Sequence, residues 1–66
     1  MNIRVNGDTV TLAAGTTLAD LITAQGLGGR RIAIERNGEI VPRSQHGDCR
    51  LDEGDRIEIV HAIGGG

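Results

Sequence analysis

The chain has 66 residues, a formal net charge of -2 and a pI near 5.5. This length allows one domain, close to the lower limit at which a single core is stable without help. Aromatic residues are absent, so the core must consist of aliphatic side chains, and the weak negative charge gives no electrostatic reason to expect a nucleic acid or an anionic membrane as partner.

The first residues predict a β-hairpin. Ile3 and Val5 alternate with polar neighbours, Asn6-Gly7-Asp8 favours a turn with positive φ, and the alternation resumes at Val10 and Leu12. No apolar run in the chain reaches the length of a signal peptide or a membrane span. A single cysteine fits a reducing compartment. We therefore expect a soluble cytoplasmic protein.

A short helix is predicted next. Thr17 and Asp20 have the spacing of a capping box, and Gly26 favours the end of a helix that runs from about Leu18 to Gln25. Leu18, Leu21 and Ile22 fall on one face of that helix. This apolar stripe is suited to packing across a sheet.

A second hairpin follows the helix. Ile32 and Ile34 alternate with other residues, Asn37-Gly38 is the strongest turn signal in the chain, and the return through Ile40 ends before Pro42. Residues 43–50 are polar and lack a period, which predicts an irregular surface connection. Leu51 is expected to anchor this connection to the core.

The last strand is predicted from Arg56 to about Ala62, after a turn at residues 52–55 whose acidic side chains are expected to be solvated. It is rich in β-branched residues, so we place it at the centre of a sheet covered by the helix. The residues expected to be mostly buried are aliphatic: Ile3, Val5, Leu18, Leu21, Ile22, Ile32, Ile34, Leu51, Ile57 and Ile59.

The final glycines form the most distinctive segment. Residues 64–66 carry no side chains, so the backbone could enter a slot too narrow for any other residue. The reactive group of this segment is the α-carboxylate of Gly66, which becomes an acyl donor when it is adenylated. We therefore divide the chain into a domain, residues 1–63, and a flexible tail, residues 64–66.

The order of these elements is similar to the ubiquitin-like β-grasp fold. The chain resembles the ThiS family of sulfur carrier proteins of thiamin biosynthesis in residue types and their spacing. The matching positions are residues 41–46, Leu51, residues 53–55, residues 57–60 and the ending 62–66. The resemblance covers essentially the whole chain. It implies an α+β fold, with a mixed sheet of about five strands and one helix packed across it.

The resemblance also implies a function. Gly66 would be adenylated by an E1-like adenylyltransferase and converted to a thiocarboxylate, with sulfur from a desulfurase system, and a thiazole synthase would receive the sulfur. Gly64 and Gly65 would be threaded into the partners' active sites. The carrier itself would catalyse nothing and bind no cofactor, and ATP would be used by the activating partner.

An exposed strip of Val60, Ala62 and Ile63 is the apolar surface nearest the tail, and we predict that partners dock there. His46 and Cys49 have a spacing seen in metal sites, but too few further ligands are present, and Cys49 has no basic cluster beyond Arg50 that would lower its pKa. No metal site is therefore predicted, and the thiol is interpreted as incidental.

Three other functions remain open at this point. The small subunit of molybdopterin synthase is a sulfur carrier with the same fold and tail, and a ubiquitin-like modifier would join target lysines through Gly66. A plain binding module with an irrelevant tail is the third. Intact mass after activation separates a sulfur carrier, a modifier and a binding module.

Overall fold

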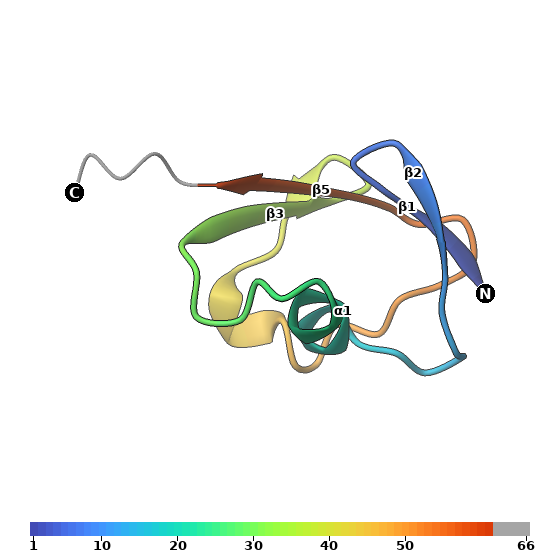
Figure 1. The fold of residues 1–66 in the computed structure, drawn as a ribbon, viewed down its shortest axis with the longest axis horizontal. Coiled ribbons are helices and arrows are strands. Elements are labelled where there is room, and N and C mark those ends of the chain that lie inside the picture. Colours follow the sequence, from blue (N-terminus) through green and yellow to red (C-terminus); the bar gives the residue numbers. More distant parts are fainter. Residues whose placement is uncertain (62–66) are drawn as a thin grey trace.

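The computed structural model describes residues 1–61 and shows a five-stranded sheet with one helix packed across it (Figure 1). Its elements, in chain order, are β1 (Asn2–Val5), β2 (Asp8–Thr11), α1 (Leu18–Ala24), β3 (Ile32–Arg36), β4 (Glu39–Ile40), the 3₁₀ helix η1 (Arg43–Gln45) and β5 (Arg56–His61). The strand order is β2-β1-β5-β3-β4. β1 and β5 are parallel and the other neighbours antiparallel, so the predicted mixed sheet with the last strand at its centre is confirmed.

Both predicted hairpins turn at an Asn-Gly pair with positive φ. Asn6 and Gly7 have φ of 50° and 87°, and Asn37 and Gly38 have φ of 52° and 86°. Two consecutive positive φ values match the right-handed twist of the flanking strands. β4, however, has only two residues, because the chain leaves the sheet edge before Pro42.

The predicted capping box is present at the start of α1. The Thr17 hydroxyl accepts a hydrogen bond from the Asp20 N–H, and the Asp20 carboxylate accepts one from the Thr17 N–H, both at 3.1 Å. The helix ends at Ala24, one residue earlier than predicted, with Gln25 as its C-cap. Gly26 follows with a φ of 72°, which relieves the strain that a side chain would suffer there.

Nine of the ten predicted core residues are buried, and these aliphatic side chains from the helix, Leu51 and the inner sheet face form one cluster. The exception is Ile32, which is only half-buried. It occupies the first position of β3 at the margin of the core, beside the half-buried Leu27. The prediction that Ile32 is mostly buried is therefore wrong.

Residues 43–50 are more ordered than predicted. Pro42, with a φ of -58°, precedes η1, and His46 is buried after it. The connection then passes the start of α1, where the N–H groups of Leu18 and Ala19 donate to the carbonyls of Cys49 (2.8 Å) and His46 (3.0 Å). These helix N–H groups have no partner within the helix, so the segment has a structural role that its polar sequence conceals.

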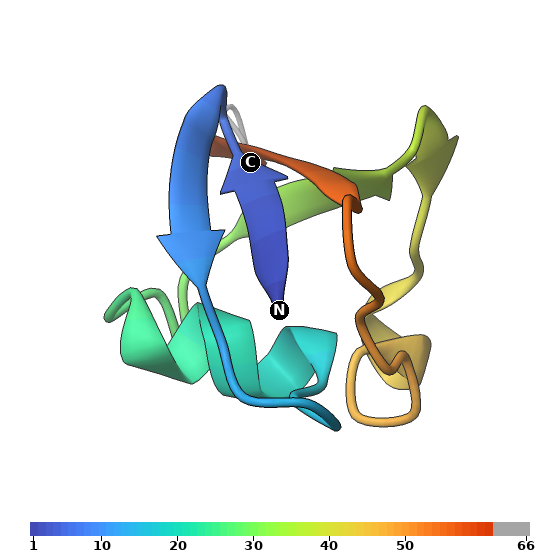
Figure 2. The same ribbon diagram turned by 90° about the vertical axis from the view of Figure 1, so that its right-hand side faces the viewer.

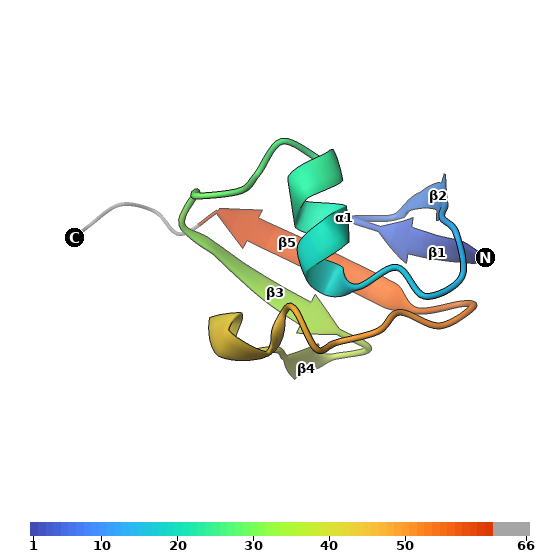
Figure 3. The ribbon, with the colours of Figure 1, turned by 90° about the horizontal axis from the view of Figure 1, so that it is seen from below.

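The two faces of the sheet have different surroundings. α1, η1 and the long connections lie on one side, whereas no helix in the described part of the chain covers the other side (Figures 1 and 2). Seen from the covered side, α1 lies across β5 (Figure 3). Within residues 1–61, no helix is long and apolar enough to cross a bilayer.

Candidate functional site

The residues predicted to carry the chemistry lie beyond the described part of the chain. Gly66, the threading residues Gly64 and Gly65, and two members of the docking strip, Ala62 and Ile63, all fall outside residues 1–61. The described part of the site is therefore β5, which leads to this segment and ends at the exposed His61. Its geometry depends on how β5 is held.

On the β1 side, β5 is held by Asn6. The Asn6 side-chain oxygen accepts a hydrogen bond from the Ile59 N–H at 2.8 Å, and its amide nitrogen donates to the Ile59 carbonyl at 3.2 Å. The side chain thus behaves like one more residue of the β1 ladder and extends its pairing toward the end of β5. The sequence predicted Asn6 only as a turn residue.

On the β3 side, the hold is ionic. The Asn37 side chain accepts from the Arg56 N–H at 2.9 Å and donates to the Asp55 carboxylate at 3.0 Å. The same carboxylate accepts from the Asp52 N–H at 2.8 Å and pairs with Arg36, whose Nη2 lies 2.8 Å from Oδ2. Arg36 also reaches the Asp52 carboxylate at 3.0 Å.

Asp55 is buried, which corrects the prediction of a solvated acidic turn. Burial by itself would raise the pKa of Asp55, but hydrogen bonds from the Asp52 N–H, the Asn37 amide and the Arg36 guanidinium hold the pKa below its usual range. Burial would likewise lower the pKa of Arg36, yet its pairing with Asp55 raises it. The pair therefore stays ionised, and it fixes the start of β5.

The outer face of β5 carries the described part of the docking strip. Val60 is 56% exposed and lies opposite Ala33, which is also exposed. The prediction that Val60 is exposed is confirmed. Ile40, on β4, is a second large apolar side chain with high exposure, 64%, and the sequence analysis did not assign it to a site.

His46 and Cys49 have separate local partners. The Nε2 atom of His46 lies 3.0 Å from the Val41 carbonyl oxygen. Arg36 Nη1 donates to Cys49 Sγ at 3.5 Å, so a basic group other than Arg50 does contact the thiol, contrary to the prediction. Among the residues that the structure describes, no group of three or more His, Cys, Asp or Glu is placed to hold a metal ion.

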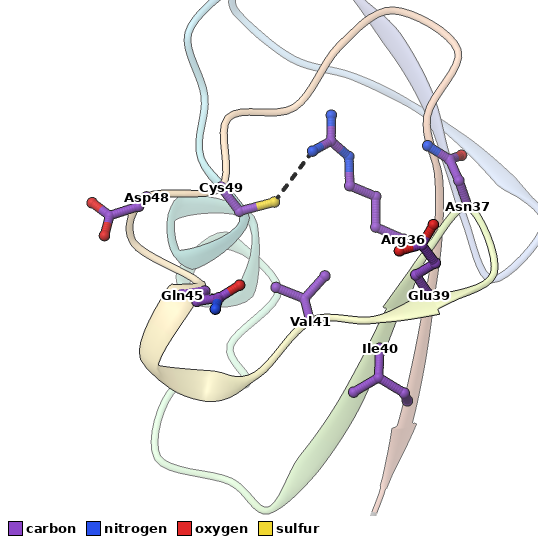
Figure 4. A pocket seen from close by; sticks show the side chains of 8 residues that line it. All are labelled: Arg36, Asn37, Glu39, Ile40, Val41, Gln45, Asp48 and Cys49. Atoms are coloured by element: carbon purple, nitrogen blue, oxygen red, sulfur yellow. Dashed lines mark hydrogen bonds between the residues drawn. The ribbon is translucent and has the colours of Figure 1, made fainter.

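The contact between Arg36 and Cys49 lies at the wall of a cavity of about 520 Å³ (Figure 4). Val41 and Ile40, from the return of the second hairpin, form another part of its lining. No pattern in the sequence indicated this cavity, because it forms between the hairpin and the connection that follows η1. It belongs to the β4 edge of the sheet, three strands away from β1.

Comparison with known proteins links the chain to one family. The model of the ThiS family matches residues 3–66. The chain is 35% identical to the sulfur carrier protein ThiS of Bacillus subtilis, with 97% of the chain and 98% of that protein covered. It is also 44% identical to a thiazole synthase of Magnetococcus marinus, which it matches over all 66 residues but only 20% of that protein.

The fold has a counterpart among solved structures. The crystal structure of the thiamine biosynthesis protein ThiS from Geobacter metallireducens superposes with a TM-score of 0.86 and 29% identity, and both chains are covered completely. This similarity, with the strand order and single helix described above, confirms the predicted ubiquitin-like β-grasp fold.

Proposed function

Since the chain belongs to the ThiS family, we propose that it carries sulfur for thiazole formation in thiamin biosynthesis, as a thiocarboxylate on Gly66. The observation that carries this proposal is the family match, which extends through the whole fold into the glycine segment. The chain spans about a fifth of the two thiazole synthases it resembles. Their similarity over the whole chain supports a thiazole synthase as the protein that receives the sulfur.

The proposed chemistry occurs in two steps, both in partner enzymes of the cytoplasm. The Gly66 carboxylate attacks the α-phosphorus of ATP in an E1-like adenylyltransferase, forming an acyl adenylate and releasing pyrophosphate. Hydrosulfide, for which a desulfurase system provides the sulfur, then attacks the acyl carbon; AMP leaves, the S–H proton is released and the thiocarboxylate remains. This carrier contributes reach and orientation, and β5 supplies both because it is hydrogen-bonded on its two edges.

Intact mass spectrometry tests the proposal. The chain is incubated with ATP, the cognate adenylyltransferase and a sulfur donor. A carrier gains about 16 Da as one oxygen is replaced by sulfur, which requires only an activated carboxylate. Conjugates of higher mass would favour a protein modifier. An unchanged mass would overturn the proposal, provided that the same enzyme preparation activates another carrier of the ThiS family.

The role of the threaded glycines has its own test. In Gly65→Val, a β-branched side chain restricts φ and widens the segment, so we expect ATP-pyrophosphate exchange to fall by about two orders of magnitude, as misplacement of a reacting atom by 1 Å can do. Gly28→Val is the matched control, because Gly28 has no positive φ and its added Cβ meets nothing within 4 Å. Equal exchange by both variants would contradict threading.

A further inference from the structure

The outward side chains of β5 are matched across the sheet by residues of the same kind. The directly opposite pairs are Arg56 with Arg4, Glu58 with Glu35, and Val60 with Ala33. Along β5 toward His61, the uncovered face of the sheet (the upper face in Figure 1) therefore carries three bands, one for each of these pairs in the same order. They are a basic band, an acidic band and an apolar band.

The two charged bands are unfavourable for the isolated fold. Like charges directly opposite each other on a sheet are destabilising. Within residues 1–61, none of the four charged side chains takes part in an ion pair. Exchanging Arg56 and Glu58 would turn both like-charged pairs into oppositely charged pairs, so the observed order does not serve the stability of the fold.

A hollow accompanies the basic band. It has a volume of about 140 Å³ and is lined by Arg4, Arg56, Gly7, Ile57 and Glu58. This volume exceeds the roughly 30 Å³ that one water molecule occupies in the liquid, and it leaves room for a side-chain carboxylate. Glu58 would repel a free anion, however. A ligand that matches both the arginines and Glu58 presents an acidic group beside a basic one, as the surface of a folded protein can.

We propose that the three bands dock one protein surface in a single orientation. Acidic side chains of the partner face Arg4 and Arg56, with one carboxylate in the hollow, basic side chains face Glu35 and Glu58, and apolar side chains face Val60 and Ala33. Because the order basic, acidic, apolar reads differently in the two directions, a reversed partner would place its acidic side chains on the apolar band and its apolar side chains on the basic band, which leaves charges on both surfaces without partners. The bands thus determine the direction in which β5 lies on the partner.

This inference rests on the proposed function, since the partner tested is the adenylyltransferase. The decisive variant is Arg56→Glu/Glu58→Arg, which keeps the net charge but reverses the order of the bands on β5. Both like-charged pairs become opposite pairs, so the melting temperature should stay the same or rise. The carrier concentration that gives half-maximal ATP-pyrophosphate exchange should rise about tenfold or more, whereas kcat at saturation should change little.

Two further variants complete the test. Arg4→Gln/Arg56→Gln removes the basic band without introducing negative charge and should also raise the half-saturating concentration, with a weaker dependence on salt. Arg43→Glu changes an exposed arginine on η1, on the covered side of the sheet, and should leave it unchanged. A rise in Arg43→Glu equal to that in Arg4→Gln/Arg56→Gln, which changes the net charge by the same amount, would indicate net charge alone and overturn the bands.

The remaining outcomes separate the two proposals. If the wild-type chain supports exchange and the exchanged and neutralised variants have wild-type half-saturating concentrations, the bands are refuted while the carrier function stands. If the wild-type chain supports no exchange with an active enzyme, both proposals fail. If the exchanged variant melts below the assay temperature, like-charge repulsion is not what the fold experiences, and the premise of the bands is wrong.

Discussion

The two Asn-Gly turns are alike in sequence and backbone, but they hold β5 by different interactions. Asn6 bonds the peptide group of Ile59 with a neutral amide, near the end of the strand. Asn37 bonds the Arg56 N–H and the carboxylate of Asp55, at the start of the strand. One turn extends a ladder, and the other belongs to a charged network centred on a buried aspartate.

This difference shows how one local motif acquires two roles from its surroundings. A primed turn needs Asn and Gly for their φ values. The Asn side chain of each turn can then form hydrogen bonds with the groups that lie beside it. Beside Asn6 lies the part of β5 that extends past the end of β1 and is paired only with β3. Beside Asn37 lies the turn that precedes β5. Substitutions at the two turns should therefore differ in size and in pH dependence.

The largest expected effect comes from removing the centre of the network. Asp55→Ala leaves Arg36 beside an apolar gap and deprives the Asp52 N–H and Asn37 amide of their acceptor. Loss of one partner of a buried ion pair typically costs about 3–5 kcal/mol. In a domain of this size such a loss would unfold a large fraction of the molecules. Urea unfolding at pH 7 measures it, and a cost below about 1 kcal/mol would show that the network is not what fixes the start of β5.

The turns themselves give the next largest effects. Asn37→Gly and Asn6→Gly keep the positive φ and remove only the side chain, so the hydrogen bonds are tested without backbone strain. We expect a loss of about 2–3 kcal/mol at Asn37, because one bond goes to a charged group, and about 1–2 kcal/mol at Asn6. Urea unfolding of both variants compares them, and equal costs would contradict the distinction drawn here.

The sequence predicted those features that depend on neighbours in the chain. Alternation fixed the strands, the spacing of Thr17 and Asp20 fixed the start of α1, and the Asn-Gly pairs fixed both hairpins. The core followed from the same periods, apart from Ile32 at its margin. The central place of β5 followed from its β-branched composition.

The features that the sequence did not predict depend on residues far apart in the chain. Asp55 lies in a turn rich in acidic residues, and its burial depends on Arg36, 19 residues away. His46 is buried because its segment passes the start of α1. Asn6 reaches Ile59 across 53 residues. The candidate site was predicted from the terminal glycines, the apolar strip beside them and the resemblance to a family, and its terminal residues lie outside the described part of the chain.

Acid should weaken the Asn37 side of β5 selectively. The pKa of Asp55 is lower in the folded chain than its unfolded value of about 3.9. The stabilisation is therefore present above the unfolded pKa and is lost as the pH falls through the folded pKa. The free energy of unfolding should fall steeply with acid in the wild-type chain and in Asn6→Gly, and less steeply in Asp55→Asn. Chemical denaturation from pH 2.5 to pH 6, a range of about 1.5–2 pH units on each side of the unfolded pKa, measures the slopes, and parallel curves for all three proteins would contradict this assignment.

The smallest effect is expected at the rim of the same network. The Asp52 carboxylate lies 3.0 Å from Arg36 Nη2, and the Asp55 carboxylate lies 2.8 Å from the same atom. The Asp52 side chain, however, is 80% exposed, whereas that of Asp55 is 8% exposed. Water screens an exposed pair, so Asp52→Ala should cost about 0.5 kcal/mol or less. Glu53→Ala is a suitable reference, because the exposed Glu53 carboxylate in the same turn accepts from the Asn2 N–H and, among residues 1–61, forms no ion pair with an arginine. Thermal melts of both variants provide the comparison. If Asp52→Ala destabilised the fold as much as Asp55→Ala, burial would not be the property that separates the two carboxylates, and the contrast between the ionic and neutral sides of β5 would need another cause.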